Sequence, residues 1–179
     1  MALTPDEKAA RARNRMLDTS RQYTLGTYSR KFVAPIFQKM IRAEWAAQPT
    51  GSVISIVDGK IEIVFRRRGQ CVCVTCGKVQ AWSGGLGGMH TGHFLGSRRL
   101  SILYDEDNVA PQCSHCNRFS NGSPQAFRMW MVHVRGYEII ERLRKLKDSS
   151  VTMTREELVD KRIEYAARLK QAQNIMRMS

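Results

Sequence analysis

The sequence predicts an α+β protein in which helices flank a central region of short strands and cysteine-containing turns. Apolar residues recur at helical spacing near both ends of the chain, an Asp-Gly pair separates two β-branched runs, and two C-x-x-C pairs lie in the middle. We divide the 179 residues into a basic helical region (1–50), a hairpin (51–68), a cysteine-containing core (69–135) and C-terminal helices (136–179).

Two helices are expected in the first region. One begins at Thr4-Pro5-Asp6-Glu7, which has the form of a capping box with proline in the first turn. This helix is basic nearly all round, so we expect it to be an exposed arm. The other covers residues 32–47 and is broken by Pro49-Thr50-Gly51. Its apolar residues at helical spacing are Ile36, Met40 or Ile41, and Trp45.

A β-hairpin is expected over residues 52–65. Asp58-Gly59 lies between two β-branched runs and favours a tight turn, because both of its central residues must tolerate positive φ. Three arginines follow directly: Arg66, Arg67 and Arg68. Such a run is either a solvated loop or, beside an active site, a contact for phosphates, and we assign it to DNA binding.

Helices are expected again after residue 122. Ser123-Pro124 should cap a helix of large apolar residues, Gly136 should end or bend it, and residues 137–147 should continue as helix. The last helix opens at a second capping box, Thr154-x-x-Glu157, and runs to about residue 176. Its apolar face consists of Leu158, Tyr165, Leu169, Ala172 and Met176.

The charge of the chain indicates a polyanionic partner. Lys and Arg number 29 against 16 Asp and Glu, a formal net charge of +13, and nucleic acid is the usual partner of such a surplus. No apolar run approaches the ~20 residues that span a bilayer, so no membrane is expected. The N-terminus lacks the apolar core of a secretion signal, so we expect a cytoplasmic protein whose thiols stay reduced.

Four of the five cysteines have the spacing of a structural zinc site. Each C-x-x-C pair, Cys73–Cys76 and Cys113–Cys116, can form a knuckle, which is a tight turn that aims two thiolates at one point. Two knuckles supply the tetrahedral sulfur shell that zinc prefers. Four sulfurs leave no open position for a substrate, so the role is structural. Cys71 is interpreted as a small buried hydrophobe, with an alternative knuckle that uses Cys71 left open.

The segment between the knuckles carries the residues of a nuclease site. It contains His90, His93 and Asn108, and Asn117 follows the second knuckle. A nuclease needs a base for the attacking water, a cation on the phosphate and a rigid frame that relates them. A histidine, then an asparagine, then a metal-ligand residue at a helix start is the ββα-metal (HNH) arrangement. The alternative is a bare zinc module in which the histidines are incidental.

The stretch CVTCG … HTGHF … LYDEDNVAPQCSHCN resembles the NinG/Rap recombination proteins of lambdoid phages. Their pattern runs C-x-x-C-G, D-x-G-H-Y/F, R-F-N-x-x-N and Q-C-x-x-C-N. The resemblance covers roughly residues 70–170, and the first 65 residues do not obviously match. The same zinc-plus-HNH layout is similar to endonuclease VII-type resolvases.

This resemblance implies site residues. His93 would be the general base, Asn108 the framing asparagine and Asn117 a metal ligand. The chain departs from the pattern at His90, where the family has Asp, and at Gly92, where many HNH enzymes place a carboxylate. Either His90 binds the catalytic metal, or Asp105 or Asp107 stands in. The metal would be magnesium or manganese, and a His90 ligand tilts the site toward softer ions.

The resemblance further implies a phage endonuclease that acts in the bacterial cytoplasm on branched recombination intermediates such as Holliday junctions, D-loops and flaps. Two alternatives stay open: a non-catalytic zinc-ribbon adaptor that binds DNA, and a homing or restriction nuclease that cuts duplex. The basic terminal helices would grip DNA arms, and the apolar face of the last helix would support a homodimer. Further candidates for phosphate contacts are Arg98, Arg99, Arg118 and Arg128.

Overall fold

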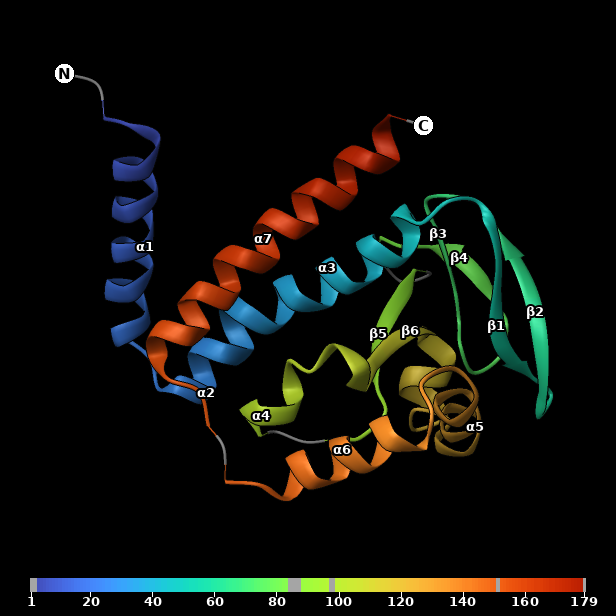
Figure 1. Cartoon of the computed structure of the whole chain (residues 1–179). Helices are drawn as coiled ribbons and strands as arrows, with labels where there is room; N and C mark the ends of the chain where they lie inside the picture. The colour runs from blue at the N-terminus through green and yellow to red at the C-terminus, as the bar shows by residue number, and fades with distance from the viewer. Residues whose placement is uncertain (1–2, 84–87, 97–98, 151, 179) are drawn as a thin grey trace.

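The computed structural model describes residues 3–83, 88–96, 99–150 and 152–178. It is a mixed α+β fold with small antiparallel sheets, as the sequence predicts. Two long helices, α3 (Ala34–Ala47) and α7 (Arg155–Arg177), run side by side and form one layer, and α1 (Pro5–Arg21) stands beside the first half of α7 (Figure 1).

Both predicted capping boxes are confirmed. The Thr4 hydroxyl accepts from the Glu7 backbone while the Glu7 carboxylate accepts from the Thr4 backbone at 2.7 Å, and Thr154 and Glu157 repeat the arrangement at the start of α7. α1 is largely exposed, although Leu17 is buried in the core.

The segment before α3 contains two elements that the sequence did not suggest, α2 (Leu25–Tyr28) and the π-helical turn η1 (Ser29–Val33). Pro35 explains the π-turn. A proline lacks the N–H of a regular helical bond and its ring collides with the carbonyl of residue i−4, here Lys31, so the helix widens before it.

The hairpin is confirmed, with β1 (Gly51–Val57) paired antiparallel to β2 (Lys60–Arg66). Asp58 and Gly59 have φ of 47° and 76°, as the two-residue turn requires. β1 is also hydrogen-bonded to the cysteine region, because the Ile56 N–H donates to the Val74 carbonyl at 3.0 Å. The hairpin therefore packs directly on the first knuckle.

The central region consists of two further strand pairs and three short helical turns. These elements are β3 (Gln70–Val72) with β4 (Val79–Ala81), β5 (Met89–His93) with β6 (Val109–Cys113), α4 (Leu100–Leu103), η2 (Glu106–Asn108) and the π-helical turn η3 (His115–Phe119). β5, β6 and η3 thus follow one another as two antiparallel strands and a helix, with α4 and η2 inserted between the strands.

Two helices then cover the central region, α5 (Pro124–Val134) and α6 (Tyr137–Asp148). Gly136, with φ of 86°, separates them as predicted. α5 begins at Pro124 with Ser123 in the N-cap position, as predicted. Ser123 adopts a left-handed conformation (φ 48°), and its side chain makes no capping hydrogen bond.

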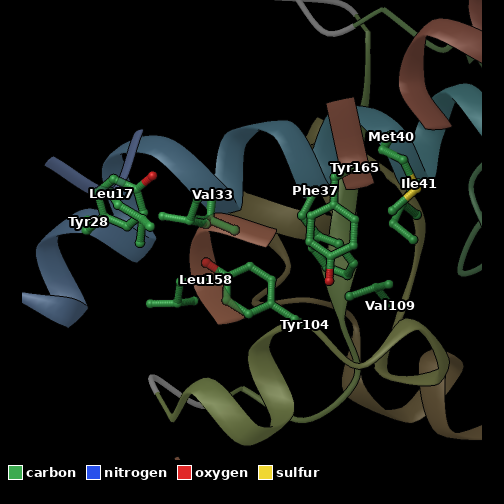
Figure 2. Close-up of a cluster of buried hydrophobic side chains, with 11 residues drawn as sticks. Leu17, Tyr28, Val33, Phe37, Met40, Ile41, Tyr104, Val109, Leu158 and Tyr165 are labelled. Atoms are coloured by element: carbon green, nitrogen blue, oxygen red, sulfur yellow. The ribbon is translucent and has the colours of Figure 1, made fainter. Parts of the chain in front are cut away.

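The largest core cluster joins the two ends of the chain. Tyr165 of α7, Phe37 of α3 and Tyr104 pack as an aromatic group, with ring centroids 5.0 and 5.4 Å from Phe37 (Figure 2). Leu158 and Tyr165 are 0% and 1% exposed. Most of the apolar face of α7 is therefore turned toward α3, while Leu169 and Met176 of that face are half-buried.

Candidate functional site

The four cysteines of the two C-x-x-C pairs meet at one point. Their sulfur atoms all lie within 4.8 Å of one another, and the Sγ atoms of Cys76 and Cys113 are 3.7 Å apart. A tetrahedral zinc with Zn–S bonds of about 2.3 Å would place its sulfurs about 3.8 Å apart. The cluster therefore fits a structural metal such as zinc.

Each knuckle is formed by local backbone geometry. The Cys73 carbonyl accepts from the Cys76 and Gly77 backbone N–H groups at 3.4 and 2.9 Å. Gly77 has φ of 73°, and a Cβ there would lie 2.6 Å from a methyl group of Val57. Glycine is needed at this position both for the turn and for the close approach of the hairpin. In the second knuckle, the Cys116 N–H donates to the Cys113 sulfur at 3.5 Å.

The thiols differ in how readily they lose their protons. Burial raises the pKa of Cys73 and of Cys76. Burial also opposes the Cys116 thiolate, but hydrogen bonds from Thr75 and Ser123 and from neighbouring thiols outweigh it and lower the pKa of Cys116. The Ser123 side chain, which makes no capping bond to α5, is therefore directed at the cysteine cluster.

Cys71 lies outside the cluster, in agreement with its interpretation as a buried hydrophobe. It is 1% exposed, and its thiol donates to the Arg42 carbonyl at 3.3 Å. Burial raises the pKa of Cys71 to about 12, so the thiol stays protonated. The alternative knuckle that uses Cys71 does not form, since the cluster consists of the other four cysteines.

His90 and Asn117 are brought together by β5 and η3. Nδ1 of His90 lies 3.4 Å from Nδ2 of Asn117, and both side chains are half-buried. Burial, then the positive charges of Arg118 and Arg42, lower the pKa of His90, so its imidazole is neutral at pH 7. A rotation of the amide by 180° would aim its oxygen at the same nitrogen. An imidazole nitrogen and an amide oxygen about 3 Å apart suit a divalent cation.

His93 projects from the other face of β5, because side chains alternate along a strand and His90 is three residues away. Nε2 of His93 lies 3.2 Å from the Leu103 carbonyl oxygen. A carbonyl accepts only, so Nε2 carries the proton and the lone pair of the neutral ring is on Nδ1. Burial lowers the pKa of His93 more than this hydrogen bond raises it.

Asn108 fixes the loop that follows His93. Its side chain is fully buried, accepts from the Leu95 N–H at 2.8 Å, and donates to the carbonyls of Leu95 and Ile102 at 3.1 and 3.3 Å. Both backbone groups of Leu95 are thus held by one amide, which closes the insertion between β5 and β6.

Asp105 and Asp107 are engaged elsewhere. Arg142 of α6 contacts Asp105 at 2.6 Å and Asp107 at 3.0 Å, and Arg135 of α5 contacts Asp107 at 3.3 Å. Each carboxylate is therefore compensated by a guanidinium. Neither can replace the family's Asp as a metal ligand without breaking these pairs.

Two arginines of the predicted DNA-binding run are partly withdrawn from solvent. Arg66 is 4% exposed, and its guanidinium donates to backbone carbonyls, among them that of Gln48 at 3.2 Å. Arg68 is half-buried, and its backbone N–H donates to the Thr50 hydroxyl at 3.0 Å. Arg66 thus serves the fold, because its donors are spent on the end of α3 and the turn after β2.

The other arginines that were predicted to contact DNA differ in their hydrogen bonds. Arg67, Arg118 and Arg128 are exposed. Arg99 is exposed too, but its guanidinium donates to the carbonyls of Lys147 and Ser149 at the end of α6. Arg98 lies outside the described residues.

Sequence reasoning missed Gln112, which is fully buried opposite His90 in the β5–β6 register. Its amide donates to the Thr75 hydroxyl and to the Gly122 carbonyl, at 3.1 and 2.8 Å. A Cβ at Gly92 would lie 2.0 Å from the Gln112 Oε1, so glycine is required there. The Q before C-x-x-C and the G before His93 were visible signals, but their pairing across strands was not.

No helix among the described residues is long and apolar enough to cross a membrane. A protein-family model described as Bacteriophage Lambda NinG protein matches residues 46–175, well over half of the chain. The match begins near the end of α3 and so includes the hairpin, which the sequence resemblance had left out. Comparisons with curated proteins and with solved structures each gave no match.

Proposed function

Because the chain belongs to the bacteriophage lambda NinG family, we propose that it is a metal-dependent HNH endonuclease that hydrolyses DNA phosphodiesters in branched recombination intermediates. The observation that carries the proposal is that Nδ1 of His90 lies 3.4 Å from Nδ2 of Asn117. His90 belongs to strand β5, and Asn117 belongs to η3, the helical turn that follows the next strand, β6. This is the order of elements in a ββα-metal site, and the four cysteines fasten its helix to the first knuckle.

In this proposal His93 is the general base. Its Nε2 is held by the Leu103 carbonyl, so Nδ1 is the atom that accepts a proton from water. The lowered pKa of His93 keeps this nitrogen unprotonated at pH 7. Asn108 keeps the strand end in place, because its amide binds both backbone groups of Leu95, two residues after His93.

The candidate residues would take different parts in the displacement. A divalent cation held by His90 and Asn117 would draw charge from the leaving oxygen, and His93 would accept the proton of the attacking water. The proposal takes two protein ligands from the residues that the structure describes, and the remaining positions would fall to water and to phosphate oxygens. The magnesium or manganese ion should accordingly bind weakly in the absence of DNA.

The test is a cleavage assay with three substrates of equal length: a four-way junction, a flap and a linear duplex, each with magnesium, manganese or nickel. The proposal expects strand cleavage that depends on the metal and favours the branched forms. Equal cleavage of duplex would favour a homing or restriction nuclease instead. Tight binding with no cleavage under any metal would favour the zinc-ribbon adaptor.

A further inference from the structure

An exposed pair of aromatic rings lies on the helix that carries Asn117. Phe119 is 80% exposed, the highest value for any Phe, Tyr or Trp among the described residues. The ring of His115, itself exposed, stacks on it with centroids 6.3 Å apart and an angle of 29° between planes. These rings belong to none of the core clusters, so packing of the described fold does not account for them.

The rings and the candidate metal site occupy opposite sides of η3. Residues two apart in a helix do not face each other, so Phe119 points away from the side of η3 that presents Asn117 to His90. Arg118 lies between them in sequence and is exposed. It directly follows Asn117 in η3, which keeps it next to the candidate site. A helix with its side chains is about 10–12 Å across, the span of one or two nucleotides.

We propose that Phe119, backed by His115, is a stacking platform for an unpaired nucleobase one or two nucleotides from the scissile phosphate, with Arg118 on the intervening phosphate. The position of the scissile phosphate rests on the proposed function. The platform itself rests on the rings and the adjacent cation.

The chemistry favours a nucleobase over another planar group. A DNA strand offers alternating phosphates and flat rings, which matches an arginine next to an aromatic pair on a chain of net charge +13. Bases inside a duplex already stack on both faces, so the platform can only receive a base that has left the helix. A junction or a flap supplies such a base, whereas intact duplex does not.

The experiment measures binding alone, in the full chain without the catalytic divalent metal, so it does not depend on cleavage. The probes are two fluorescein-labelled 20-mers of equal phosphate number, one of ordinary single-stranded DNA and one of abasic residues throughout. Phe119→Ala should weaken binding of the first by about 5- to 100-fold and leave the second unchanged. Phe119→Trp should retain the affinity of the original chain.

Two control variants separate stacking from general effects. Tyr137→Ala removes another exposed aromatic ring, 61% exposed at the start of α6, and should change neither affinity. Arg118→Gln should weaken both probes equally, because it removes only a phosphate contact. Equal losses for Phe119→Ala on both probes, or no loss on either, would overturn the platform while leaving the nuclease proposal standing. If the original chain cleaves no DNA but these binding results are obtained, the nuclease proposal would be overturned and the platform would stand.

Discussion

The Gln112 side-chain amide donates to the Thr75 hydroxyl at 3.1 Å, and the same hydroxyl lies 3.3 Å from the Cys73 sulfur, so this bond joins the two cysteine knuckles beside their sulfurs. Thr75 lies between Cys73 and Cys76, and Gln112 directly precedes Cys113. A second bond from the same amide reaches the Gly122 carbonyl, beyond η3. The knuckles and the helix that carries Asn117 are thus related by a buried polar contact as well as by the sulfur cluster.

Loss of one sulfur should still release the metal and disrupt the core. Structural zinc sites contribute on the order of 10 kcal/mol in finger peptides, comparable to the stability of a whole domain. Cys113→Ala should therefore contain no zinc and lose much of its folded structure, as measured by elemental analysis and circular dichroism. Cys71→Ser is the matched control and should keep its zinc. A folded Cys113→Ala protein with one zinc would contradict the assignment.

His93→Ala should bind DNA normally and cleave it about 100-fold more slowly or worse, because a general base contributes about that factor. The pKa of His93 is lowered below its ordinary 6.5, so cleavage by the original chain should persist below pH 6.5 before it declines. Rate measurements from pH 5 to 8 test both points. Unchanged cleavage by His93→Ala would move the base to another residue.

The lowered pKa of His93 also determines the direction in which the free energy of unfolding changes with pH. The folded state holds His93 neutral where the unfolded chain would already be protonated, so the unfolded state binds more protons in that range. The contribution of His93 to the free energy of unfolding should be complete above pH 6.5 and fall as the pH drops through the interval below it. Denaturant unfolding of the original chain and of His93→Gln, compared at pH 7.5 and 5.5, should show a smaller pH dependence in the variant.

His90→Asp should shift metal preference toward magnesium, because it exchanges an imidazole for the hard carboxylate that the family pattern contains. The measurement compares cleavage rates with magnesium, manganese and nickel for both forms. His133→Asp, an exposed histidine on α5, controls for added charge. Identical metal profiles for His90→Asp and the original chain would place His90 outside the metal site.

Asn108→Ala should lower the free energy of unfolding by about 2–4 kcal/mol, because it leaves the buried backbone groups of Leu95 without partners. Asn121→Gly, at an exposed turn where φ is 49° and glycine fits without strain, should cost far less. Chemical denaturation of both variants decides the matter. A cost at position 108 no larger than at position 121 would show that the loop is held by other contacts.

The exposed cations of α1 should contribute to DNA affinity through salt-dependent contacts. Replacing Lys8, Arg11 and Arg15 together by Gln should flatten the log–log dependence of affinity on salt by up to about 2.7, roughly 0.9 per phosphate contact. Arg13 is left in place because it pairs with Asp160 of α7 at 2.6 Å. An unchanged slope would mean that α1 does not touch DNA.

Local signals predicted much of this fold. The Asp-Gly turn, the two capping boxes and the paired C-x-x-C motifs each specify their structure within a few residues, so sequence alone was sufficient for them. The π-turns η1 and η3 were not predicted. They arise from constraints that a helical periodicity does not record, in η1 a proline placed after the turn.

The candidate site was harder to predict because its contacts are non-local. The sequence left Asp105 and Asp107 open as an alternative to His90 at the metal, and it could not show their arginine partners, which come from helices about 30 residues further on. The burial of Arg66 likewise depends on the end of α3, not on its neighbours in the arginine run. The pairing of Gln112 with Gly92 becomes visible only when the two strands are aligned.

The ion pairs of Asp105 and Glu106 set a lower limit on the length of a stably folded fragment. Asp105 relies on Arg142 of α6, and Glu106 relies on Arg168 of α7, which it meets at 2.8 Å. A fragment of residues 69–135 would retain all four cysteines and all three candidate catalytic residues, yet it would lack both arginines. It would also expose the ring of Tyr104, which packs against Phe37 of α3 and Tyr165 of α7. Attempts to shorten the protein for crystallisation or fusion should therefore keep the chain through α7.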